Sequence, residues 1–278
     1  MLEYLALAPF RRALIALAVT GLAFPALGTY ILALELVPAR FAVMHASLLG
    51  AAVGLFFGIS PLASALVASV LAGAGIARLS ERSAASAGGS LGLVMTLSLG
   101  LAFILFYKSD VNAVEAFNLF WGSVLALSET DLILTVGGAI AVIILAMVFL
   151  REIQAVLYDR VLAAAQGIPA RAVYFGIIIL VCLGIGLAMK VTGALMIDAV
   201  TILPALAARS MRRGFRGTLI RGAIFGISIN YGGFALAMVL DLPTSPAIIV
   251  VGALFVFAGK LAERRIDRRS ARITSRPS

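Results

Sequence analysis

Nine apolar runs, each close to the length of a membrane-spanning helix, constrain the fold of this chain more than any other feature. They cover residues 10–36, 41–58, 60–78, 91–107, 132–150, 171–190, 191–208, 217–240 and 244–262. A helix needs about 20 apolar residues to cross the hydrocarbon core of a bilayer. The short alternating segments of a membrane β-barrel are absent from the sequence. We therefore predict an all-α, polytopic transmembrane bundle of about eight or nine spans, in a single domain over residues 1–278.

Several of these runs are separated by only one or two residues that interrupt a helix. Ser60 and Pro61 divide the second run from the third, and Lys190 with the pair Thr192–Gly193 divides the sixth from the seventh. Such short separations leave open that some of these runs are half-helices or re-entrant segments.

The charged residues are few, and their distribution predicts the orientation in the membrane. They make up 13% of the chain, whereas a soluble domain has about a quarter. The net charge of +9 comes from basic residues in short loops and in the tail, 263–278. Because positive loops stay on the cytoplasmic side, we expect this tail and the loop 151–170 to be cytoplasmic and the acidic stretch 109–115 to be external. The basic residues then set the orientation, and we expect no binding of nucleic acid. The N-terminus is then external if all nine runs span.

The second run contains the only histidine, His45, beside a stripe of small residues. Ala46, Gly50, Gly54 and Gly58 recur at every fourth position, so we place them on one helix face that another helix, or a second copy of the chain, can approach closely. His45 either forms a packing hydrogen bond or faces a translocation path, because ionisable groups at membrane depth tend to mark substrate routes.

The longest polar interruption within the chain is 158–169. Asp159 can cap a short helix there, and Gly167 followed by Pro169 can end it. We expect a short amphipathic helix on the cytoplasmic face, which is either a plain loop helix or the docking element for a cytoplasmic motor subunit.

A second local signal precedes the run 132–150. Ser128 and Asp131 have the spacing of a capping box, which predicts that a helix begins there. Upstream, the region 110–127 contains Trp121, a residue typical of membrane interfaces. We expect a short external helix that lies on the bilayer.

Four segments together carry a resemblance to a known family. Residues 45–50 read His-Ala-Ser-Leu-Leu-Gly, 158–169 run from Tyr-Asp to Gln-Gly-Ile-Pro, and 189–209 run from Met-Lys-Val-Thr-Gly to Pro-Ala-Leu-Ala-Ala-Arg. A weaker match is Phe-Trp-Gly-Ser at 120–123. In this order and spacing, over roughly residues 10–262, the chain resembles the membrane permease of zinc, manganese and iron ABC importers.

This resemblance implies a type II importer fold in the bacterial inner (cytoplasmic) membrane. Two permeases, identical or paralogous, would form a dimer with the metal path between them. Two ABC ATPase subunits would dock at Asp159, Gln166 and Gly167, and an extracytoplasmic metal-binding protein would deliver the cargo. The permease would need no cofactor of its own, because the divalent metal is its substrate.

The sequence departs from the family at one position. The family aspartate four residues before the histidine is Phe41 here. Another acid, Asp198, lies in an apolar run, where a charge costs at least about 2.5–3.5 kcal/mol and should have a partner or face water. We expect His45 and Asp198 to contact the metal; alternatively, Asp198 pairs with Lys190 or Arg40, or bonds to backbone at a helix break.

Two motifs of catalytic or nucleotide-binding sites are missing from the sequence. It has no HExxH and no phosphate-binding GxxxxGK[ST] pattern, so we expect no enzyme activity and an energy source outside the chain. One rival function is a proton- or sodium-coupled secondary transporter of a small solute, but such folds often show paired repeats, and no clear repeat is present. A membrane-embedded enzyme would need more than one histidine, and a scaffold would leave Asp198 without a purpose.

Overall fold

The fold is a bundle of membrane-length helices. The computed structural model describes residues 7–82, 87–109, 122, 124–193, 196–211 and 214–274. Within them, eight helices are long and apolar enough to cross a membrane, and no strand occurs. This confirms the all-α prediction. The eight helices are α1 (Ala8–Ala33), α2 (Val37–Phe56), α3 (Pro61–Arg82), α4 (Ala87–Lys108), α6 (Glu129–Val148), α9 (Ala170–Thr192), α11 (Gly214–Leu240) and α12 (Thr244–Thr274).

The run 191–208 does not form a full span. Its helix, α10 (Ile197–Arg209), has 13 residues, which is about 20 Å at 1.5 Å per residue and shorter than the hydrocarbon core of about 30 Å. The preceding helix α9 ends at Thr192, and Gly193 follows with a φ of 78°. Because L-residues with side chains rarely adopt this conformation, glycine allows the chain to leave α9 here. The seventh run is therefore a half-helix.

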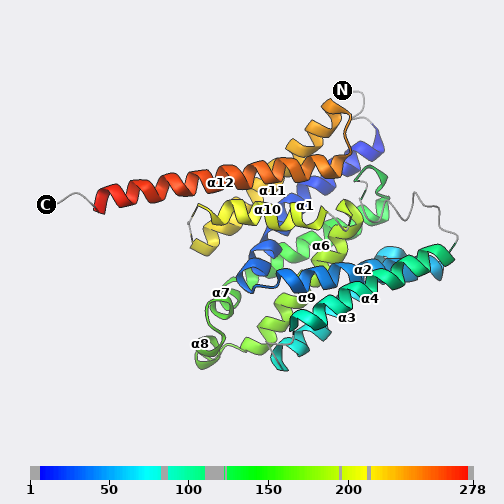
Figure 1. Ribbon diagram of the computed structural model, residues 1–278, viewed down its shortest axis with the longest axis horizontal. Helices are drawn as coiled ribbons and strands as arrows, with labels where there is room; N and C mark the ends of the chain where they lie inside the picture. Colours follow the sequence, from blue (N-terminus) through cyan, green and yellow to red (C-terminus); the bar gives the residue numbers. More distant parts are fainter. Residues whose placement is uncertain are drawn as a thin grey trace.

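The helices form two neighbouring groups. In one, α2 packs against α3 and α4, and α3 packs against α9; in the other, α10, α11 and α12 pack against one another. The first helix, α1, contacts α10, α11, α6 and α9 and so joins the groups. Figure 1 shows α12, α11 and α10 along one side of the bundle and α2, α3 and α4 along the other.

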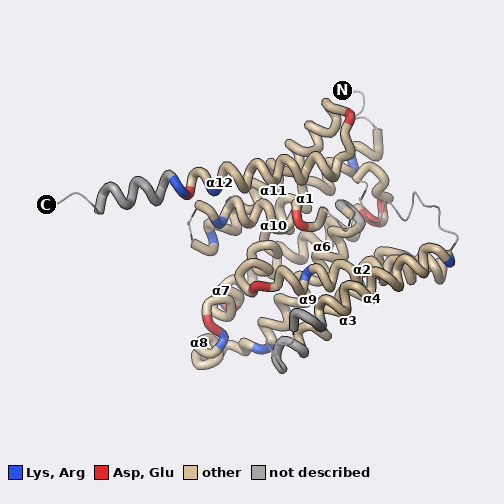
Figure 2. Tube along the Cα trace, in the orientation of Figure 1, with Lys and Arg blue, Asp and Glu red and all other residues tan. Residues whose placement is uncertain are grey.

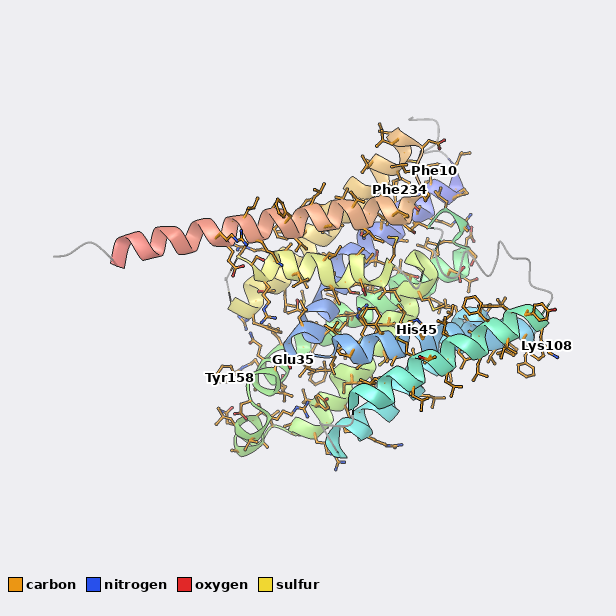
Figure 3. The ribbon with its side chains drawn as sticks, viewed as in Figure 1. Phe10, Glu35, His45, Lys108, Tyr158 and Phe234 are labelled. Carbon is orange, nitrogen blue, oxygen red and sulfur yellow. The ribbon has the colours of Figure 1, made fainter. Side chains whose placement is uncertain are left out.

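The two ends of the bundle differ. Glu35 and Tyr158 lie at one end and Lys108 at the opposite end (Figure 3). The Glu35 end also carries α7 (Leu150–Tyr158) and α8 (Arg160–Ala165), and α12 continues beyond the bundle on this side (Figure 1). Figure 2 shows Lys and Arg at the α10–α11 turn, around α8 and on α12 at this end. The charge distribution therefore predicts that α7 and α8 face the cytoplasm.

The small-residue stripe of α2 packs against α3 of the same chain. A Cβ atom on Gly50 would lie 2.5 Å from the Cβ of Ala68, and one on Gly54 would lie 2.8 Å from the Cα of Pro61. The stripe is shorter than the spacing suggested, because α2 ends at Phe56 and Gly58 lies in the following turn with a φ of 68°. A role for Gly50 and Gly54 between two copies of the chain stays a prediction.

The start of α6 has the predicted capping box. The Ser128 hydroxyl accepts a hydrogen bond from the backbone of Asp131 at 3.1 Å, and the Asp131 carboxylate accepts one from the backbone of Ser128 at 3.2 Å. The external helix expected over 110–127 lies mostly outside the described residues, as do Phe120 and Trp121; the described part contains a short 3-10 helix, η2 (Val124–Ala126).

Candidate functional site

A buried arginine forms the centre of the candidate site. Arg40, the fourth residue of α2, is only 2% exposed. Its guanidinium forms an ion pair with Asp198 of α10, in which Nη1 contacts Oδ1 and Nη2 donates to Oδ2 at 2.9 Å. This two-point geometry is the strong form of the arginine–carboxylate contact. It meets the requirement that a buried charge be paired.

The two partners of this pair have very different surroundings. The side chain of Asp198 is 38% exposed, whereas that of Arg40 is 1% exposed. Asp198 is the second residue of α10, where the dipoles of the first-turn peptides favour an anion. The cation is therefore enclosed by protein, while the carboxylate reaches the surface of the isolated chain.

Phe41 occupies the position at which the family resemblance implies an aspartate. Its ring centroid lies 4.2 Å from the guanidinium carbon of Arg40, a distance at which a cation is attracted to the face of an aromatic ring. The side chain of Phe41 is 37% exposed. An aromatic ring thus covers the buried cation where a second carboxylate would otherwise stand.

His45 lies one turn further along α2 and is half-buried. Its Nδ1 is 2.7 Å from the carbonyl oxygen of Phe41. Because a carbonyl only accepts hydrogen bonds, the neutral ring carries its proton on Nδ1 and has its lone pair on Nε2. Metal-binding histidines are oriented by the same kind of bond from their second nitrogen.

The structure does not join His45 and Asp198 by a direct contact. Arg40 and His45 are five residues apart on α2, which places them about 140° apart around the helix and about 7.5 Å along it. Arg40 holds Asp198 on one side of α2, and the bond of His45 stays within its own helix. In the described part of the chain, no group of three or more His, Cys, Asp or Glu side chains could hold a metal ion.

The ion pair with Arg40 is the alternative that the sequence left open for Asp198. The side chain of Lys190, the other candidate partner, lies outside the described residues. Sequence reasoning named Arg40 only as one of two possible partners of Asp198. The available signal was its position beside a long apolar run, where an arginine needs an anion or a route to water.

The predicted polar element at 158–169 is helical. Asp159 ends α7 and caps α8, because its Oδ1 accepts hydrogen bonds from the backbone of Val161 at 2.7 Å and of Leu162 at 3.0 Å. Gln166 follows the last turn of α8, and Gly167 leaves the helix with a φ of 81°. The cap and the glycine therefore define both ends of a helix of six residues.

One face of α8 holds the helix on the bundle and the other is open. Ala163 is buried, and the guanidinium carbon of Arg160 lies 3.2 Å from the ring centroid of Tyr174 in α9. Tyr158 and Val161 are 87% and 80% exposed. A groove beside α8 reaches the ends of α1 and α11; it is lined by Ala33, Gln154, Tyr158, Leu162, Gln166 and Phe215. This surface offers an apolar contact outside the membrane spans.

Comparison with known proteins gives the same family as the sequence motifs. Residues 7–262 match the ABC 3 transport family. The manganese transport system membrane protein MntC of Halalkalibacterium halodurans is 25% identical over 249 residues, 89% of this chain and 85% of the relative. The high-affinity zinc uptake system membrane protein ZnuB of Haemophilus influenzae is 28% identical over 220 residues, 79% of this chain and 84% of the relative.

The fold matches a solved structure as well. The structure of PsaBC from Streptococcus pneumoniae in complex with Fab superposes with a TM-score of 0.84 at 23% identity and covers 93% of each chain. None of these similarities favours the gradient-driven alternative, and the family match extends over nearly all of the membrane-spanning region. The chain therefore belongs to the ABC 3 transport family, and it is a multi-pass membrane permease subunit of an ABC transporter.

Proposed function

We propose that this permease imports a divalent metal, zinc, manganese or iron, across the bacterial inner membrane at the expense of ATP hydrolysed by a separate subunit. The capped helix α8, with an exposed apolar face at the basic end of the bundle, is the observation that carries this proposal. The manganese and zinc systems named for the relatives support the choice of cargo. The lack of a nucleotide-binding motif in this sequence explains why a partner must supply the energy.

The proposed ATPase contact consists of Asp159, Gln166, Gly167 and the exposed face of α8. Because α8 is capped at its start and is held to α9 by the Arg160–Tyr174 contact, movement of a docked subunit would be passed to α9, which begins at Ala170. A short rigid helix suits this role better than a flexible loop would.

The proposed transport path lies between this chain and a second permease, identical or paralogous. His45 and Asp198 are the polar side chains that we place on the cargo side. An extracytoplasmic metal-binding protein would deliver the cargo to the end of the bundle opposite α8. Alternating access would open this path first to one side of the membrane and then to the other.

Three experiments test the proposed function. An ABC ATPase should co-purify with the tagged chain from its native membranes. Val161→Asp should abolish this co-purification, because it places a charge on the apolar face of α8. Lys260→Asp adds the same carboxylate on α12 at the same end of the bundle and should leave the complex intact. A strain that lacks the permease should accumulate less of one metal when zinc, manganese and iron are compared. Transport by the purified chain alone, driven by an ion gradient without an ATPase, would refute the proposal.

A further inference from the structure

We propose that the metal passes this permease as a complex, with its coordination sphere already filled by a small chelating ligand, and not as a bare dication. The inference rests on the proposed function of metal import and specifies the form of the cargo. It follows from the charges and ligands that Arg40, Phe41, His45 and Asp198 present together.

The carboxylate of Asp198 is already occupied. Each of its oxygens faces a different nitrogen of the Arg40 guanidinium, with 2.9 Å between Nη2 and Oδ2. A bare dication could use this carboxylate in only two ways. It would have to displace Arg40 or bind beside the positive charge of Arg40.

Displacement is unfavourable because the guanidinium of Arg40 is enclosed by protein and cannot reach water. Its side chain is 1% exposed, and Phe41 covers its face. Removing the anion would leave an uncompensated charge inside the protein, which is strongly destabilising. The 38% exposure of Asp198 does not change this, since the cost arises on the buried side of the pair.

Binding beside the pair is unfavourable because of like charge. An ion at a typical metal–oxygen distance of about 2.0–2.2 Å from Asp198 would lie within a few ångströms of the guanidinium. In surroundings of low dielectric constant this repulsion is far stronger than in water. Arg40 and Asp198 together carry no net charge, so this pair does not compensate a dication.

The remaining ligand is the imidazole of His45. Its Nδ1 is bonded to the Phe41 carbonyl, which leaves Nε2 free to bind one position on a metal. Zinc and manganese require several N, O or S ligands to replace their water. A symmetric second copy would add one more imidazole and no free carboxylate. This arrangement cannot strip the water from a bare ion, but it can pass a complex that already carries its own donors and presents one open site or an apolar edge to Phe41.

Direct binding measurements test the inference without any partner protein. We would titrate the purified, detergent-solubilised full chain with manganese chloride and zinc chloride. At the Arg40–Asp198 pair, the wild-type chain should bind neither manganese nor zinc with submillimolar affinity. Arg40→Met should free the carboxylate and raise the affinity about tenfold or more. The double variant Arg40→Met/Asp198→Asn should lose that gain, which assigns it to Asp198.

The opposite results would overturn the inference. Tight binding of either bare ion by wild type that Asp198→Asn abolishes would show that Arg40 does not block the carboxylate. No gain in a folded Arg40→Met chain would also refute it. If Arg40→Met does not fold, the wild-type titration still decides.

An uptake assay separates this inference from the proposed function. A deletion strain complemented with wild type would receive radioactive manganese or zinc, either as the free ion or buffered with excess citrate or histidine. Complementation should restore uptake of the buffered metal. Uptake that follows the free-ion concentration alone would refute transport as a complex while leaving metal import intact. Failure of both forms to enter would refute metal import, whatever the titrations show.

Discussion

Arg40 and Asp198 lie 158 residues apart in the sequence and form a two-point ion pair between α2 and α10. These two helices pack mainly against other partners, α2 against α3 and α4 and α10 against α1, α11 and α12. The ion pair is therefore a specific link between the two groups of helices. Its asymmetric burial leads to the first prediction.

Removing the carboxylate of Asp198 should destabilise the protein more than removing the guanidinium of Arg40. Asp198→Asn leaves the fully buried Arg40 unpaired and should lower the free energy of unfolding by about 3–5 kcal/mol. Arg40→Met leaves a carboxylate that is already 38% exposed, so its effect should be clearly smaller. Denaturant unfolding in detergent, followed by circular dichroism, measures both. Equal losses in the two variants would contradict the asymmetry.

The contact between α1 and α10 should tolerate no side chain at Gly28. A Cβ atom there would overlap the backbone carbonyl of Thr201, and two packed helices can relieve the overlap only by moving apart. Gly28→Ala should therefore lower stability by about 1–3 kcal/mol. Gly100→Ala in α4 is the matched control, because no atom lies within 4 Å of its added Cβ.

The control should respond in the opposite direction. Alanine is favoured over glycine within a helix by about 0.5–1 kcal/mol, so Gly100→Ala should be neutral or stabilising. Thermal unfolding of the two variants side by side tests the pair. A stable Gly28→Ala protein would mean that α1 and α10 are not in close contact.

Asn230 should contribute to the packing of α11 on α1. The side chain is fully buried, and its amide donates to the carbonyl of Leu17 at 2.8 Å and to the hydroxyl of Thr20 at 3.3 Å. Asn230→Ala should cost about 1 kcal/mol, a typical value for a hydrogen bond between membrane helices. Ser228→Ala should have little effect, because Ser228 is exposed and bonds to Ile224 of its own helix. The ranking of the two variants by denaturant midpoint is the readout.

The side-chain cap at the start of α8 should be needed to couple ATP hydrolysis to metal uptake. Asp159→Ala removes both capping hydrogen bonds and should destabilise the helix locally by about 1 kcal/mol. We expect ATP hydrolysis by the assembled transporter to continue without metal uptake. Asp159→Asn keeps a good cap and should retain uptake. Normal coupling in Asp159→Ala would show that the end of α8 need not be rigid, and loss of coupling in both variants would assign the effect to the charge of Asp159.

Helices and their caps, which depend on residues close together in the chain, were predictable from the sequence. Apolar runs of membrane length predicted the helical bundle, because a bilayer requires internal backbone hydrogen bonds whatever the neighbours are. Ser128 and Asp131 predicted the start of α6, and Asp159 and Gly167 the ends of α8, because each cap involves residues only a few positions apart. The ordered motifs also predicted the family.

Only the tertiary structure decided the features that depend on distant parts of the chain. The length of the run 191–208 allowed a span, but α9 continues to Thr192, Gly193 follows with a positive φ, and α10 has only 13 residues. Spacing placed Gly58 on the stripe of α2, yet the helix ends two residues before it. Above all, hydropathy revealed that Asp198 needed a partner but not which one, because that choice depends on how α2 and α10 are rotated toward each other by all the helices around them.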